Sequence, residues 1–266
     1  MKVRFLSALG LVAILPLLAA DGDLVPQARF HDGAAAFRAG DYASAEAAWR
    51  EVLAAGVVDG HVLYDLGEAL YRQGENGAAI LAWRRAELLL PRDPDVRANL
   101  ELARGQVHDA VEPQSHVPAL LFWQRSLSLQ ESATLGSLLA GLALGLWAWL
   151  RWRRRAHGGS ASGYGSLGPL AIIAGVLGAL LLASTALTAR ALTTTPAAVV
   201  LQPEVAARSA VGADGVELFV LHEGAEVRAA QRDFDHVLVV LPDGRRGWLP
   251  AASVGLVLPE AEFPGE

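Results

Sequence analysis

Apolar residues follow three different patterns along the chain, and each pattern predicts a different kind of structure. From residue 27 to about residue 107 the pattern is helical. Two uninterrupted apolar runs, 133–150 and 167–189, are each close to the length of about 20 residues that a helix needs to cross a bilayer. From about Pro196, short valine- and leucine-rich runs bounded by glycine, aspartate and proline predict strands.

The helical region repeats with a period of 34 residues, which is the period of a helix–turn–helix repeat. The matching pairs are Gly33 and Gly67, Phe37 and Tyr71, Arg38 and Arg72, Gly40 and Gly74, Ala45 and Ala79, and Trp49 and Trp83. We expect the first glycines to let paired helices touch and the second glycines to end each first helix in a left-handed conformation. The alanines are small enough for close packing, and the tryptophans are predicted to fill the gap to the next pair.

A third helix is predicted after Pro91, with Asp93 as its cap and Pro94 as its first residue, running to about Val107. The second copy of the repeat resembles the tetratricopeptide repeat family, on the series Leu66, Gly67, Gly74, Ala79, Trp83, Ala86 and Pro91. Stacks of this kind usually need about three units. Two pairs and a cap helix are therefore minimal, and a partner or the membrane surface is expected to complete the stack.

The resemblance implies that partner proteins bind as peptide segments along the concave face built by the first helix of each pair. The candidate partner-binding residues are Arg38, Glu68, Tyr71, Arg72 and Asn99. The two arginines recur one period apart, a spacing that suits gripping carboxylates or backbone carbonyls of an extended chain. The alternative is that each arginine only solvates a helix end.

Basic residues predict how the apolar runs are oriented. Arg151, Arg153, Arg154 and Arg155 follow the first run, and placing four arginines at the bilayer centre would cost about 10 kcal/mol in total. The cluster therefore ends the first span and marks its cytoplasmic end, because cytoplasmic loops are rich in arginine and lysine. Both flanking regions then lie on the outer face of the membrane. Two buried helices of a soluble protein are the alternative, although such helices rarely run this long without a charge.

Two further patterns refine this topology. Lys2 and Arg4 precede an apolar run and Ala19-Ala20, the layout of a secretory signal peptide or, if it is not cleaved, of a short anchor. Small residues recur every four positions in both apolar runs and are expected to form a packing seam, since they let membrane helices approach closely. They are Ser137, Gly141 and Gly145, and Ala171, Gly175, Ala179 and Ala183.

The strand-rich region is predicted to form a small barrel from runs at 198–201, 216–221, 225–230, 236–241 and 254–258. Asp243, Gly244, Gly247 and Trp248 lie in a segment that resembles the hairpin of the bacterial SH3-type domain, and 223–227 resembles its strand start. The family's early asparagine–valine–arginine signature is reduced to Ala206-Ala207-Arg208-Ser209, which weakens the transfer of a cell-wall peptide site. Trp248 either lines a binding surface or packs half-buried.

Composition narrows the possible functions. The chain has 266 residues, no cysteine and a net charge of −6, which excludes disulfides and thiolate metal sites and disfavours a nucleic-acid partner. The seven histidines show no metal-ligand spacing. Neither Ser115-His116 nor Gly165-Ser166-Leu167-Gly168 completes a hydrolase motif. We therefore expect a protein without enzymatic activity, cofactor or metal.

The order of the segments resembles, over almost the whole chain, the BatE-like proteins of bacterial aerotolerance clusters. That resemblance implies MoxR-type ATPases and membrane-anchored von Willebrand factor A proteins as partners. The expected function is that of an inner-membrane scaffold, with peptidoglycan binding through the SH3-type domain as the alternative. The expected division is signal 1–20, repeats 21–112, juxtamembrane segment 113–132, span 133–150, arginine-rich linker 151–166, span 167–189, SH3-type domain 196–258 and tail 259–266.

Overall fold

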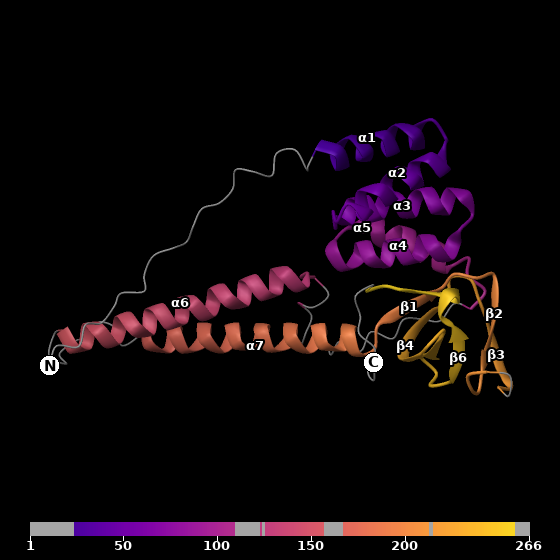
Figure 1. Cartoon of the computed structure of the whole chain (residues 1–266). Helices are drawn as coiled ribbons and strands as arrows, with labels where there is room; N and C mark the ends of the chain where they lie inside the picture. Colours follow the sequence, from indigo (N-terminus) through magenta and orange to yellow (C-terminus); the bar gives the residue numbers. More distant parts are fainter. Residues whose placement is uncertain (1–23, 110–122, 124–125, 157–166, 213–214, 259–266) are drawn as a thin grey trace, which may run out of the picture.

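The computed structural model describes residues 24–109, 123, 126–156, 167–212 and 215–258 (Figure 1). In these residues the chain is a mixed α/β protein with seven α-helices and a seven-stranded antiparallel sheet. The predicted signal 1–20, the tail 259–266 and the linker residues 157–166 lie outside the described residues, as does most of 113–125.

The first five helices of the described chain form a stack, which lies beside the sheet in Figure 1. They are α1 (Leu24–Arg38), α2 (Tyr42–Ala54), α3 (Gly60–Gln73), α4 (Asn76–Leu89) and α5 (Pro94–Arg104). Aspartate side chains cap the N-termini of α2, α3 and α5 by accepting backbone N–H bonds of 2.7–3.1 Å. Gly40 and Gly74 have φ of 81° and 85°, as the left-handed ends of α1 and α3 require.

The same glycine–tryptophan contact occurs in both helix pairs. A Cβ on Gly33 would lie 2.6 Å from Nε1 of Trp49, and one on Gly67 would lie 2.5 Å from Cδ1 of Trp83. Each indole therefore packs against the glycine of its own pair, a contact that the sequence pattern did not predict. The helices of a pair approach so closely that the ring takes the space a side chain on the facing helix would need.

A hairpin of two long helices follows, α6 (Leu129–Ala156) and α7 (Leu167–Thr194). Both are long and apolar enough to cross a membrane. The first helix does not end with the apolar run at residue 150 but continues through the arginines to Ala156. Arginine is a good helix former, and cations are favourable at a helix C-terminus, so the cluster extends the helix.

The packing seam of this hairpin differs from the predicted one on α6, whereas on α7 the predicted Gly175 does face Ala143. Gly141 and Gly145 have no atom within 4 Å of an added Cβ, so they do not face α7. A Cβ on Gly178 would instead lie 2.8 Å from the backbone of Ala140, and one on Gly136 would lie 3.0 Å from Leu182. The error arose because alanine and glycine are so frequent in α6 that several of its faces carry small residues at four-residue spacing.

The sheet follows α7 in the order β3-β2-β6-β5-β4-β1-β7. Its strands are β1 (Ala197–Val200), β2 (Glu204–Arg208), β3 (Glu217–His222), β4 (Glu226–Asp233), β5 (His236–Val240), β6 (Arg246–Pro250) and β7 (Val254–Leu256). Strands β2 and β6 lie outside the five predicted runs. Each has only two buried positions between exposed or half-buried ones, and β6 contains glycine and proline, so neither looks like a strand by composition.

The sheet packs directly against α4 of the helical stack. Val199 and Val257 share one hydrophobic core with the buried residues of the helices. Gly77 of α4 lies so close to β1 that an added Cβ would stand 2.5 Å from the Val200 carbonyl oxygen, and its N–H donates to Glu223 at 2.7 Å. Arg85 donates to the Leu256 carbonyl oxygen at 2.8 Å. The sheet thus covers the face of α4 that was expected to need a partner or the membrane.

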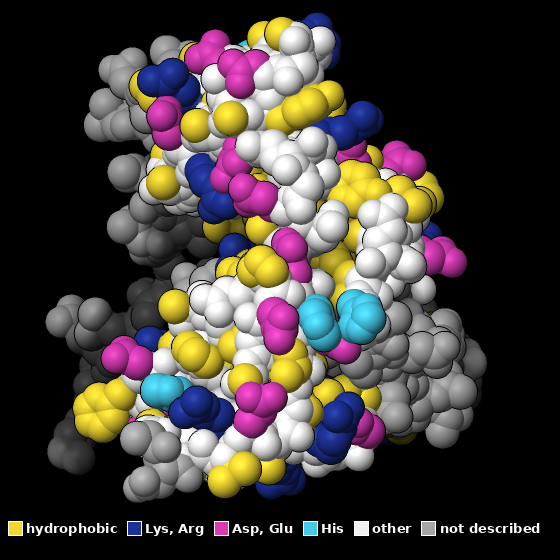
Figure 2. Space-filling model, turned by 90° about the vertical axis from the view of Figure 1, so that its right-hand side faces the viewer, with side chains coloured by type: hydrophobic (Ala, Val, Ile, Leu, Met, Phe, Trp, Pro, Cys, Tyr) yellow, Lys and Arg dark blue, Asp and Glu magenta, His cyan; other side chains and the backbone are white. Residues whose placement is uncertain are grey.

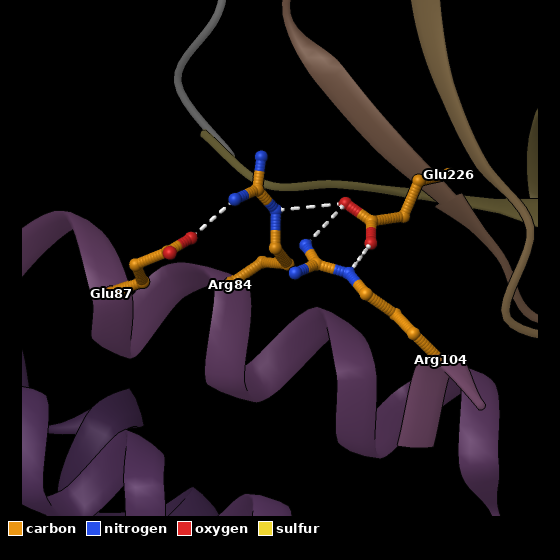
Figure 3. Close-up of polar contacts among 4 residues, drawn as sticks. All are labelled: Arg84, Glu87, Arg104 and Glu226. Carbon is orange, nitrogen blue, oxygen red and sulfur yellow. Dashed lines mark hydrogen bonds and ion pairs between the residues drawn. The ribbon is translucent and has the colours of Figure 1, made fainter. Parts of the chain in front are cut away.

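One carboxylate is the ionic centre of this contact (Figure 3). Glu226 at the start of β4 accepts from Arg104 Nε at 2.5 Å through Oε1 and from Arg104 Nη2 at 3.1 Å through Oε2, and Arg84 Nε lies 3.0 Å from Oε2. The Arg84 contact is within ion-pair distance, but its angle does not make a hydrogen bond. The Glu226 side chain is only 13% exposed. Burial lowers the pKa of Arg104, but the hydrogen bond and charge of Glu226 outweigh it and raise that pKa overall.

We predict that Gly67→Ala lowers the free energy of unfolding by about 2 kcal/mol, because the new methyl group overlaps the Trp83 ring in a packed core. Urea unfolding of the full chain in detergent, followed by tryptophan fluorescence, measures the change. Gly105→Ala is the matched control, since its Cβ would lie 3.4 Å from the nearest atom. Equal stability of the two variants would contradict the packing described.

We predict that Glu226→Gln lowers the free energy of unfolding by about 2 kcal/mol, since it leaves partly buried Arg104 without its countercharge and Arg84 with Glu87 alone. Asp32→Asn removes an exposed pair with Arg29 and should change the same quantity by less than about 0.5 kcal/mol. If both variants unfolded at the same urea concentration, the contact between the helical stack and the sheet would not depend on this ionic cluster.

Candidate partner-binding face

Helix α3 carries the residues from which the candidate site is built. Tyr64, Glu68 and Tyr71 follow one another at spacings of four and three residues, which places them on one side of the helix. All three are half-buried, while the opposite side of α3 is packed into the core. Because α3 is fixed at both ends by the Asp59 cap and the left-handed Gly74, this row is held rigidly.

Side chains from α5 and the residues just after it hydrogen-bond to that row. Asn99 Nδ2 donates to the Tyr64 hydroxyl at 3.2 Å and also to the Glu68 carboxylate. Gln106 Nε2 donates to the Tyr71 hydroxyl at 2.8 Å. We call these five residues the polar strip. The strip joins the second helix pair to the cap helix through side chains that remain partly accessible.

The structure thus brings three of the five predicted residues, Glu68, Tyr71 and Asn99, into one strip. Sequence reasoning missed Gln106, which lies two residues beyond the end of α5 and has no counterpart one period away. Tyr64 on α3 was not among the candidate residues either. Its signal was its spacing of four residues from Glu68.

The two predicted arginines are not part of the strip. Arg38 is exposed at the end of α1 and its Nε donates to the Ala34 carbonyl oxygen at 3.0 Å, one turn earlier in the same helix. Arg72 is exposed near the end of α3. Arginines at these positions interact favourably with the unpaired carbonyls at a helix C-terminus. For Arg38 the structure therefore shows the helix-end role that the sequence had left as an alternative.

The electrostatics of α3 favour neutral or positively charged ligands. Burial raises the pKa of Asp65 to about 6, an effect that His61 opposes and that Glu68 and Asp59 increase. Burial and the charge of Glu68 also raise the pKa of Tyr64. The row thus combines hydroxyl, amide and carboxylate groups, which suits hydrogen bonding to an extended peptide more than it suits an acidic one.

The other predicted residues lie elsewhere. Asp243 accepts from the backbone N–H of Arg245 at 2.9 Å in the turn before β6, and Gly244 there has a φ of 88°. Gly247 is buried against Ala207, and Trp248 is half-buried beside β2, opposite Arg208. The four arginines of α6 lie at the end of the hairpin away from the sheet (Figure 1).

No cluster of metal-binding side chains occurs within the described part of the chain. Acidic and basic side chains alternate over the face shown in Figure 2, which has no large area of one sign. In comparisons with protein-family models, curated proteins and solved structures, nothing matches this chain.

We predict that Asp65→Asn stabilises the protein at alkaline pH. The folded-state pKa is raised above the unfolded value, so the folded carboxyl binds its proton more tightly and the charged form costs stability above pH 6. The variant should gain about 1 kcal/mol at pH 8, a figure reduced for solvent screening of a partly exposed group, and nothing at pH 3.5. Urea unfolding at both pH values measures this; an equal gain at both would contradict it.

Proposed function

We propose that the protein is a non-catalytic membrane-anchored scaffold that holds a partner protein on the polar strip of its helical stack. The observation that carries the proposal is the strip itself, a row of hydrogen-bonding side chains fixed on capped helices and accessible from one side. Such a row offers both donors and acceptors to the main chain of an extended segment. The 34-residue period and its glycine–tryptophan contacts support a tetratricopeptide-like stack.

The membrane location and orientation rest on two features. Both long helices are apolar and largely exposed along their lengths, as expected for helices surrounded by lipid. The helical stack and the sheet pack against each other, so both must lie on the same side of any membrane that α6 and α7 cross. With the arginines at the opposite end of the hairpin facing the cytoplasm, both folded parts lie in the periplasm, on the outer face of a bacterial inner membrane.

The BatE-like resemblance supplies the partners of this proposal. They are a MoxR-type ATPase and von Willebrand factor A proteins of an aerotolerance cluster, of which the membrane-anchored members share the same face. The sheet, proposed as an SH3-type barrel, then serves first to complete the helical stack, since its β1 and β7 strands lie on α4.

Photo-crosslinking tests the scaffold role in intact cells. A photoreactive residue at position 71 is expected to capture a defined membrane-anchored protein, whereas one at exposed position 50 on α2 should not. Adding Glu68→Ala and Asn99→Ala should lower the captured fraction about tenfold, because each loses a hydrogen bond that orders the strip. Arg38→Glu with Arg72→Glu tests the two outlying arginines in the same assay.

The proposal fails if position 71 captures nothing more than position 50, or if the strip variants capture as much as the parent chain. Sedimentation of the purified protein with murein separates the alternative. Binding to murein that persists in the strip variants, without protein capture, would favour a cell-wall protein instead.

A further inference from the structure

The end of α6 that lies away from the folded parts gathers arginines and tryptophans. Arg151 Cζ lies 5.1 Å from the centroid of the Trp147 ring, and Arg153 Cζ lies 5.1 Å from that of Trp149. Trp152, Arg154 and Arg155 are exposed beside them. The folded parts join the hairpin at its other end, where Arg92 donates to the Ser126 carbonyl oxygen at 3.1 Å and β1 follows α7 (Figure 1).

Stacking on an indole orders a guanidinium group without using its hydrogen-bonding edge. The five N–H donors of arginine lie in the plane of the group, so the flat face contacts the ring while the edge suits a phosphate or carboxylate. The chain holds no Asp or Glu between residues 132 and 190, and Glu131 lies in the first turn of α6, at the opposite end of the helix, so neither helix places a carboxylate beside these cations. The cluster is therefore a preordered, positively charged surface.

The start of α7 adds to this surface. Gly178 faces Ala140 and Gly175 faces Ala143, which sets the antiparallel register of the hairpin. In that register the first residue of α7, Leu167, lies level with Arg151 of α6. The first N–H groups of a helix have no partner within it and form the positive end of its dipole. The arginine side chains of α6 and the positive end of the α7 dipole thus lie at the same end of the hairpin.

The apolar residues next to the cluster indicate which anion it fits. Trp147 on α6 and Leu170 and Ile173 on α7 are each at least 55% exposed and lie just inside the arginines along the hairpin. A free phosphate makes no use of such a surface, whereas a phospholipid places its headgroup among arginines and its acyl chains along the adjoining apolar residues.

We propose that this end of the hairpin binds the phosphate headgroups of anionic phospholipids, in the leaflet remote from the folded parts. The inference rests on the membrane location proposed above, but not on the scaffold role. Arg151 and Arg153 bind the headgroup, and Trp147 and Trp149 orient them.

Native mass spectrometry of the detergent-purified full chain, titrated with phosphatidylglycerol or phosphatidylcholine, tests the proposal. Phosphatidylglycerol should bind at least tenfold more tightly. Arg151→Gln with Arg153→Gln should weaken its binding about 25-fold, roughly fivefold for each arginine near a membrane surface. The control, Arg228→Gln with Arg246→Gln, removes two exposed arginines of the sheet and should bind as the parent chain does.

Three results would overturn the inference: equal binding of the two lipids, no loss in the Arg151 and Arg153 variant, or complete displacement of phosphatidylglycerol by millimolar inorganic phosphate. Extraction of the protein from cell membranes by alkaline carbonate would instead refute the proposed location. Loss of photo-crosslinking at position 71 with intact lipid selectivity would refute only the scaffold role.

Discussion

The arrangement of this protein depends on the contact between Glu226 and the arginines Arg84 and Arg104. A carboxylate that is mostly shielded from water and two partly buried guanidinium groups are costly to bury alone; Glu226 offsets the charge of Arg104 and shares that of Arg84 with Glu87. Around them the stack and the sheet approach closely, with Gly77 and Gly255 leaving no room for side chains where the sheet meets α4. The ionic cluster therefore specifies one relative placement of stack and sheet, and the apolar contacts provide most of the favourable burial.

This placement links the fold to the proposed function. A two-pair helical stack leaves one face of α4 without a neighbour, and here a sheet from the far end of the sequence takes that position. The chain must pass through both long helices before it can return to make the contact. If α6 and α7 cross a membrane, as proposed, two parts that touch must lie on the same side of it, and the polar strip is then accessible there to the proposed partner.

Much of the fold was predictable where one local signal sufficed. The left-handed glycines, the Asp93 cap and the long apolar runs are properties of short segments, and the structure has them at the predicted residues. Contacts between separate elements were harder to predict from the sequence. Nothing in the pattern shows which small face of α6 meets α7, or that Trp49 and Trp83 pack within their own pairs. The contact between the stack and the sheet was not predicted at all, because Glu226 and Arg104 are 122 residues apart and each looks like an ordinary surface charge. For the same reason the strip was found only in part: Glu68, Tyr71 and Asn99 follow from the repeat, whereas Gln106 depends on how the chain leaves α5.

Disulfide formation between the helical stack and the sheet is the most direct test of this account. The chain has no cysteine, so Leu81→Cys with Gly255→Cys introduces a single pair, at a place where a Cβ on residue 255 would lie 3.4 Å from the present Cγ of Leu81. In membranes treated with a mild oxidant, we predict that most of the protein forms the intramolecular disulfide. Leu81→Cys with Gly244→Cys should form no disulfide, because a Cβ on residue 244 would have no other part of the chain within 4 Å. If the first pair stayed reduced in folded, membrane-bound protein, the stack and the sheet would not be docked and the account would be wrong.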